Sequence, residues 1–115
     1  MGTLYYGDAR VPIEVEDRAL AHVKFVILAK LRRNEGFGFS WMKPLSEGSG
    51  RGTVWLHPSI PLHFEFSGSR SPNLNRAWLE LLTQQAATSG GLTLVEEPPN
   101  EAASTEEVPL TVRSA

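Results

Sequence analysis

The 115-residue chain contains no cysteine, which removes disulfide bonds, thiolate catalysis and cysteine-ligated zinc from consideration. It also contains no apolar run close to the roughly 18–20 residues that span a bilayer. Its first residues do not place a basic segment before an apolar one, as a secretory signal does. We therefore expect a cytoplasmic protein that does not enter a membrane.

Residues that usually mark catalysis are also scarce. The chain has only two aspartates, Asp8 and Asp17, and no Gly-x-Ser-x-Gly nucleophile elbow. The glycine-rich residues 48–53 lack the lysine of a phosphate-binding loop and lead into a predicted strand. His57 and His63 are expected on opposite faces of a tight hairpin, so they do not converge on a metal ion. The sequence predicts no catalytic residue, no cofactor and no metal site.

Charge divides the chain into a mildly basic body and an acidic end. Residues 1–95 hold ten Lys or Arg and eight Asp or Glu, a net charge of +2, whereas residues 96–115 hold one Arg and five Glu, a net charge of −4. The end segment is rich in Pro, Glu, Ala, Ser and Thr, and this composition buries too little apolar surface to offset its ordering entropy. We predict a single domain over 1–95 and a disordered acidic tail over 96–115.

Hydrophobic periodicity and turn residues predict an α+β fold, with a mostly antiparallel sheet of five to six strands packed with two helices. Pro12 cannot donate a ladder hydrogen bond, so its strand is expected at a sheet edge. The predicted order is β-β-α-β-β-β-α-β. Strands are expected at 3–7, 11–15, 36–42, 53–57, 62–68 and 92–96, and helices at about 18–33 and 71–88.

The stretch from Arg51 to Pro72 is expected to form a β-hairpin that leads into the second helix. Two alternating segments, TVWLH and LHFEFSG, are joined by the short loop PSIP. If these segments pair, Trp55 faces Phe64 across the hairpin. Both faces are partly apolar, so the hairpin is expected near the centre of the sheet.

The helix predicted over 18–33 has two unlike sides. Leu20, Val23, Ile27 and Leu31 form a buried stripe, with Leu28 beside them, and Asp17 is expected to cap the helix. The opposite side carries basic and apolar residues together, and we interpret it as covered by another layer or a second subunit, or as a binding surface. The candidate partner contacts are Arg18, His22, Phe25, Val26, Arg32 and Arg33.

A second candidate site precedes the second predicted helix, at Ser67, Ser69, Arg70 and Ser71. Ser71 suits the N-cap position, with Pro72 as the first helical residue. Because a helix N-terminus offers free N–H donors and positive potential, a phosphate or carboxylate is expected to fit there. The alternative is that the serines only cap the helix while Arg70 is solvated.

The strand GFGFSW resembles the first ribonucleoprotein motif of RNA-recognition domains, in which exposed aromatic residues stack on bases. Glu35 stands where that motif has Lys or Arg, and the strand directly follows a helix. The favoured interpretation is that Phe37, Phe39 and Trp41 form a core face.

Three stretches carry a family resemblance: LAHVKFVILAKLRRNEGFGFSW, GRGTVWLHPSIPLHFEFSGSR, and LNRAWLELL with a following Gly-Gly-Leu. Over residues 1–98 the chain resembles a small actinobacterial family of unknown function, whose members often bear the automatic label ATP-dependent DNA ligase. Ligase chemistry needs a nucleophilic lysine in Lys-x-Asp-Gly, and Lys24, Lys30 and Lys43 do not fit this motif. We predict a non-enzymatic module that associates with a protein partner or with itself. The alternative is a nucleic-acid-associated protein linked to DNA end processing, using Arg18, Arg32, Arg33 and Arg70.

Overall fold

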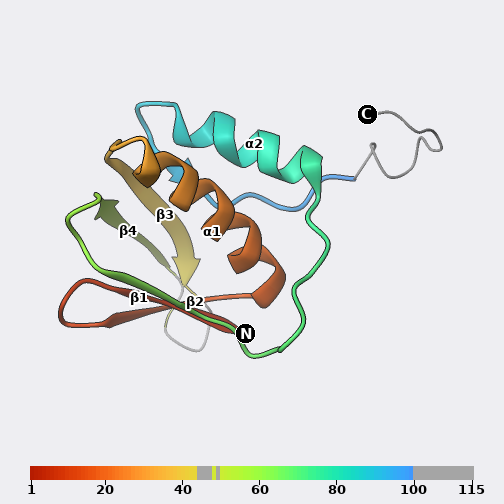
Figure 1. The fold of residues 1–115 in the computed structure, drawn as a ribbon, viewed down its shortest axis with the longest axis horizontal. Coiled ribbons are helices and arrows are strands. Elements are labelled where there is room, and N and C mark those ends of the chain that lie inside the picture. The colour runs from red at the N-terminus through yellow and green to blue at the C-terminus, as the bar shows by residue number, and fades with distance from the viewer. Residues whose placement is uncertain (44–47, 49, 100–115) are drawn as a thin grey trace.

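The computed structural model describes residues 1–43, 48 and 50–99 (Figure 1). The predicted α+β class and the order β-β-α-β-β-β-α-β are confirmed within these residues. The elements are β1 (Gly2–Tyr6), β2 (Val11–Val15), α1 (Asp17–Arg32), β3 (Phe37–Lys43), β4 (Gly50–Leu56), β5 (Leu62–Glu65), α2 (Arg76–Ala86) and β6 (Leu92–Thr93).

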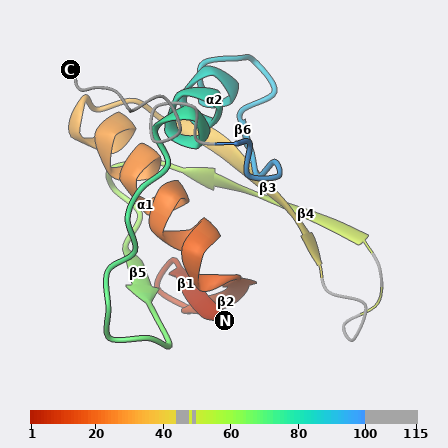
Figure 2. The same ribbon diagram turned by 90° about the vertical axis from the view of Figure 1, so that its right-hand side faces the viewer.

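The described strands divide between two three-stranded sheets, rather than joining one sheet of five to six strands. The first sheet has the order β2-β1-β5 and is antiparallel. In the second sheet, β3 lies between antiparallel β4 and parallel β6. The strand that contains Pro12 lies at an edge, as predicted. Figure 2 shows β3 and β4 extending away from the helices.

The predicted hairpin between β4 and β5 is wrong. β4 pairs with β3, so Trp55 lies opposite Gly38, whereas β5 pairs with β1 and Phe64 lies opposite Leu4. The Tyr6 hydroxyl links the two sheets by donating to the Trp55 carbonyl over 2.7 Å. Alternation predicts which side chains share a face, but it does not select the strand with which they pair.

Glu16, rather than Asp17, caps the start of α1. Its carboxylate accepts the backbone N–H groups of Arg18 and Ala19, at 2.9 and 3.1 Å, which satisfies donors that have no partner within the helix. The buried face of α1 contains most of the predicted stripe. The larger apolar residues of this buried face are Leu20, Val23, Val26 and Ile27.

Both sheets share one hydrophobic core with the two helices. The helices lie side by side over the sheets (Figure 1), with α1 against β1 and α2 against β3 and β6. Leu4, Leu20, Phe39, Leu82 and Leu92, one from each of five elements, are fully buried in this core. Within the described residues, both sheets and both helices therefore contribute to one buried cluster.

Contacts continue past the predicted domain boundary at residue 95. Arg18 and Asn75 both donate to the Glu97 carboxylate, and Asn75 also donates to the Pro98 carbonyl. Glu97 and Pro98, which the sequence assigns to the tail, are thus hydrogen-bonded to α1 and to the residue that caps α2. The remainder of that predicted tail, 100–115, lies outside the described residues. Over the described part of the chain, no helix has the length and apolar character that crossing a bilayer requires.

Candidate functional site

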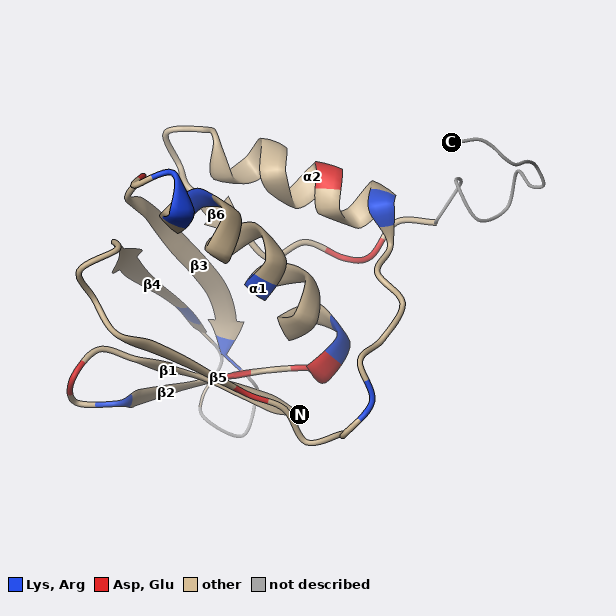
Figure 3. Cartoon of the chain, viewed as in Figure 1, with Lys and Arg blue, Asp and Glu red and all other residues tan. Residues whose placement is uncertain are grey.

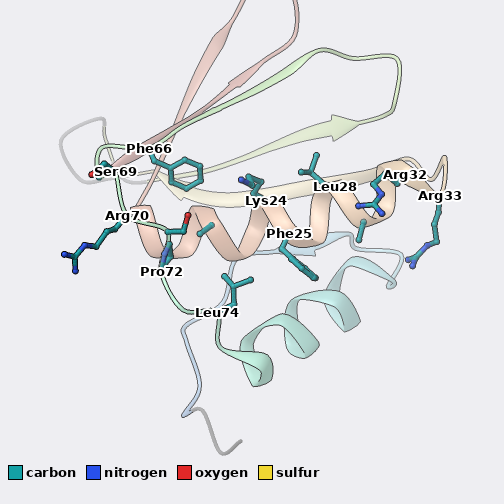
Figure 4. Close-up of a pocket in the computed structure, with 14 residues that line it drawn as sticks. Lys24, Phe25, Leu28, Arg32, Arg33, Phe66, Ser69, Arg70, Pro72 and Leu74 are labelled. Carbon is teal, nitrogen blue, oxygen red and sulfur yellow. The ribbon is translucent and has the colours of Figure 1, made fainter. Parts of the chain in front are cut away.

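A groove of about 880 Å³ lies between α1 and the segment that leads into α2 (Figure 4). It brings together residues from the two sites that the sequence predicts separately. One is the outer side of α1, and the other is the serine-rich corner that contains Ser69, Arg70 and Ser71. One wall is formed by α1 and its C-cap, with the residues Ala21, Lys24, Phe25, Leu28, Ala29, Arg32 and the cap Arg33. The other wall is formed by Phe66, Gly68, Ser69, Arg70, Ser71, Pro72 and Leu74.

Large apolar side chains remain open to solvent inside the groove. Phe25, Leu28 and Leu74 are 52%, 41% and 39% exposed. Figure 4 shows Phe25 and Leu74 projecting on the α2 side of α1. Apolar residues that cluster in a concave surface mark a place where a ligand or partner gains contact area.

Four cationic side chains surround these apolar residues. Arg70 lies at one end of the groove, Arg32 and Arg33 lie at the other, and Lys24 lies between them (Figure 4). Figure 3 shows the basic segments in blue along α1 and on the loop that leads into α2. The Lys24 ammonium is 5.4 Å from the centre of the Phe66 ring, while Arg33 Nε is 3.3 Å from the Glu35 carboxylate. None of the described residues that line the groove is acidic. The side chains that line the groove therefore carry only positive formal charges, offset at Arg33 by Glu35, and this charge favours an anionic ligand.

The helix start predicted at Ser71 is wrong. α2 begins at Arg76, and the Asn75 side chain caps it by accepting the Trp78 N–H over 3.3 Å. The two residue types cap helices about equally well, and Asn75 stands next to the apolar residues of the α2 stripe. The helix N-terminus consequently gives no support to an anion site at the serines. Ser69, Arg70 and Ser71 instead line the wall of the groove.

The donors of Ser67 and Gly68 already have a carboxylate partner within the chain. Asp17 accepts the Ser67 N–H at 3.1 Å and the Gly68 N–H at 3.0 Å, and these hydrogen bonds, that of Gly68 first, lower the pKa of Asp17. The Ser67 hydroxyl donates to the Met1 carbonyl. The donors of Ser67 are therefore not available to an anion at the predicted site. The same hydrogen bonds from Ser67 and Gly68 to Asp17 connect the loop wall of the groove to the start of α1.

His22 and Val26 are buried, so they are removed from the candidate partner surface. His22 Nε2 accepts the Asn75 N–H over 2.8 Å, which leaves Nδ1 to donate to the Arg18 carbonyl at 2.8 Å. The His22 ring also packs on Trp78, with 4.5 Å between ring centres. His22 and Val26 are buried because they lie on the side of α1 that α2 covers.

Arg18 is likewise engaged within the fold. Its guanidinium donates to both oxygens of Glu97, at 2.9 and 2.8 Å, and to the Asn73 carbonyl at 3.0 Å. The hydrogen bonds from Arg18, and then from Asn75, lower the pKa of Glu97 to about 2. Arg18 is thus a structural residue that fixes the chain after β6, not a free cation for a partner.

No metal site is found in the described part of the chain. There, no three side chains of His, Asp or Glu lie close enough together to hold an ion. His57 Nδ1 is 2.8 Å from the Ser59 hydroxyl, and His63 Nε2 is 2.6 Å from Glu65. The two histidines belong to different local networks.

Residues 1–97 match a family described as a domain of unknown function, DUF7882. The chain belongs to the DUF7882 family. The matched region ends at Glu97, so it includes the residue that pairs with Arg18. No curated protein and no solved structure matches the chain.

The predicted site residues do not include several that line the groove of this DUF7882 domain, among them the larger side chains of Lys24, Leu28, Phe66 and Leu74. A usable signal exists on α1, because Lys24, Leu28 and Arg32 follow one another at the i, i+4 spacing of a single helix face. Leu28 was expected beside the buried stripe, yet it lies on this open face. Phe66 and Leu74 come from a distant segment, and no local pattern connects them to α1.

Proposed function

We propose that this DUF7882 domain is a non-enzymatic, cytoplasmic binding module. Its groove takes an acidic segment that also carries apolar side chains, supplied by a protein partner or by a second copy of the chain. The observation that supports this proposal is the exposed Phe25 in a groove lined by four cations and no acidic residue. Such a combination matches a peptide that brings both carboxylates and apolar anchors.

The expected affinity is modest. Fully burying an apolar side chain contributes about 1.5–3 kcal/mol, so burying the exposed parts of Phe25, Leu28 and Leu74 contributes about 2–4 kcal/mol. Rim cations mainly raise the association rate and the salt dependence, and association itself costs at least about 4 kcal/mol of lost freedom. Because these apolar contributions only about equal that cost, binding is expected to be weak and to require the charged contacts as well.

The test uses fluorescence anisotropy with a labelled 12-residue peptide that alternates Glu and Leu. The full chain should bind this probe, and Phe25→Asp should weaken binding at least about tenfold, which corresponds to about 1.4 kcal/mol. The loss combines missing apolar contact with repulsion between the new carboxylate and the acidic probe. The unfolding free energy should stay within about 0.5 kcal/mol of the wild type, because residue 25 is exposed.

A matched control is Val11→Asp, at a residue that is 47% exposed on an edge strand outside the groove. It should bind the probe as the wild type does. A second peptide, with Lys in place of Glu, should not bind. Light scattering of the wild type and Phe25→Asp examines the second-copy form, since only that form predicts a concentration-dependent dimer that Phe25→Asp abolishes. Equal binding by Phe25→Asp and the wild type would contradict the proposal.

A second candidate is a nucleic-acid-associated protein, favoured by the row of cations at Lys24, Arg32, Arg33 and Arg70. The ligase label carried by the actinobacterial proteins that this chain resembles makes DNA the probe to use. If four phosphates are contacted, log affinity should fall with log salt concentration with a slope of about −3 to −4. Arg32→Gln and Arg70→Gln should then each reduce that slope, while Phe25→Leu should leave it unchanged. No binding of duplex or single-stranded DNA at low salt would exclude this candidate.

A further inference from the structure

We propose that the groove has an occupant within the same chain, the acidic segment 101–112. This inference rests on the proposed function, because it assigns a ligand to the same groove. The segment reads EAASTEEVPLTV, so its three carboxylates precede three branched apolar side chains. It has the two properties that the groove selects, negative charge and apolar anchors.

The last described residues of the chain lie beside the end of the groove that contains Ala21 and Leu74. The Pro98 carbonyl accepts a hydrogen bond from the Asn75 side chain over 2.8 Å, and Asn75 directly follows Leu74, which lines the groove. Glu97 is held by Arg18, one helical turn before Ala21, the first lining residue of α1. The Arg18–Glu97 pair therefore places the start of the remaining chain beside the groove.

The length of the chain is sufficient for this contact. The groove follows α1 from Ala21 to Arg33, which is about 18 Å at 1.5 Å per residue. Six residues, 100–105, reach up to about 20 Å, and residues 106–112 extend over about the same distance. Glu106 and Glu107 are thus within reach of Lys24 and Arg70, and Val108 and Leu110 are within reach of Phe25.

A tethered segment does not need high affinity. Short flexible linkers give effective concentrations of about 1 mM, so an intrinsic dissociation constant of about 1 mM occupies roughly half of the molecules. The apparent affinity for an external ligand falls in proportion to the open fraction. The segment therefore weakens binding of an external acidic partner, about twofold at half occupancy and about tenfold at nine-tenths.

The absence of cysteine from the chain makes a direct test available. Ser114→Cys introduces a single thiol for a nitroxide spin label on the 115-residue chain, and amide signals are recorded by NMR. Signals of residues 21–33 and 69–74 should broaden selectively. The broadening should disappear in Glu106→Lys/Glu107→Lys and in Phe25→Asp, and it should persist in the matched control Val11→Asp. Uniform broadening, no broadening, or broadening that ignores these substitutions would refute the inference.

A mixture of spin-labelled unenriched protein with unlabelled ¹⁵N-enriched protein separates contact within one chain from contact between chains. Broadening in the mixture as strong as in the single labelled sample would overturn the proposal in favour of exchange between two copies.

The alternating Glu/Leu probe peptide distinguishes this inference from the proposed function. If the wild type binds the probe but shows no selective broadening, the inference is wrong and the binding function stands. If broadening occurs but Glu106→Lys/Glu107→Lys binds no probe, the external binding function is wrong and the internal contact stands. If both hold, Glu106→Lys/Glu107→Lys should bind the probe about two- to tenfold more tightly than the wild type, and equal affinity would contradict occupancy by the tail.

Discussion

Replacing Glu97 with Gln is expected to change the pH dependence of stability in a defined way. The Glu97 carboxylate receives two hydrogen bonds from Arg18 and one from Asn75, and these hold its pKa at about 2 rather than 4.5. Because the folded-state pKa is depressed, the ionised group stabilises the fold fully above about pH 4.5. This contribution is lost as the pH falls through about 2.

The expected magnitude follows from that pKa and from the exposure of the side chain. For a fully shielded group, such a shift corresponds to roughly 3 kcal/mol. The Glu97 side chain is 32% exposed, so solvent screening reduces the expected contribution to about 1–2 kcal/mol. Glu97→Gln should therefore lower the unfolding free energy by about 1–2 kcal/mol at pH 7, and the difference from the wild type should shrink towards zero near pH 2.

Urea unfolding at several pH values between 2 and 7, followed by tryptophan fluorescence, measures this difference. Trp78 is a suitable reporter because it is buried and its indole N–H donates to the Val95 carbonyl, two residues before Glu97. Glu96→Gln is the matched control at an exposed neighbouring carboxylate, and it should change stability by less than about 0.5 kcal/mol. A difference between the wild type and Glu97→Gln that stays constant from pH 7 to pH 2 would refute the reasoning.

Two substitutions test the packing around the candidate groove and the second sheet. His22→Ala should lower the unfolding free energy in urea by about 2–4 kcal/mol, because it leaves a cavity and an unpaired Asn75 N–H; an effect below about 1 kcal/mol would contradict this role. Gly91→Ala should cost about 1–3 kcal/mol, since Gly91 has a φ of +81° and a Cβ there would lie 2.6 Å from the Gly38 carbonyl oxygen. Gly90→Ala, which meets nothing closer than 3.9 Å, is the control and should be close to neutral in the same urea titration.

The burial of residues on α1 is only partly predicted by the spacing of apolar residues along the helix. Helical spacing correctly predicts that Leu20, Val23 and Ile27 are buried and that Phe25 points elsewhere. It also places Val26 and His22 on the side of α1 opposite that stripe, yet both are buried because α2 packs there. Periodicity describes one helix at a time, so it cannot report a second helix that covers an additional face.

The prediction of a helix start at Ser71 is wrong for a related reason. Ser71-Pro72 has the composition of a helix start, but the loop is held by Asp17, which accepts hydrogen bonds from residues 50 and 51 positions away. Asn75 then caps α2 and donates its N–H to His22, 53 positions earlier. These contacts depend on how the elements are stacked, and capping propensity alone carries no information about that stacking.

By itself, the sequence determined the order of helices and strands, the α+β class, the edge position of the Pro12 strand and most of the buried stripe of α1. These properties depend on alternation, helical spacing and turn residues within a few positions of one another. Only the tertiary structure decided that β4 and β5 belong to different sheets, that Arg18 pairs with Glu97 across 79 positions, and that α1 and residues 66–74 enclose one groove. The physical reason is that such contacts form only after long loops close, and their energies depend on shape and charge brought together from distant parts of the chain.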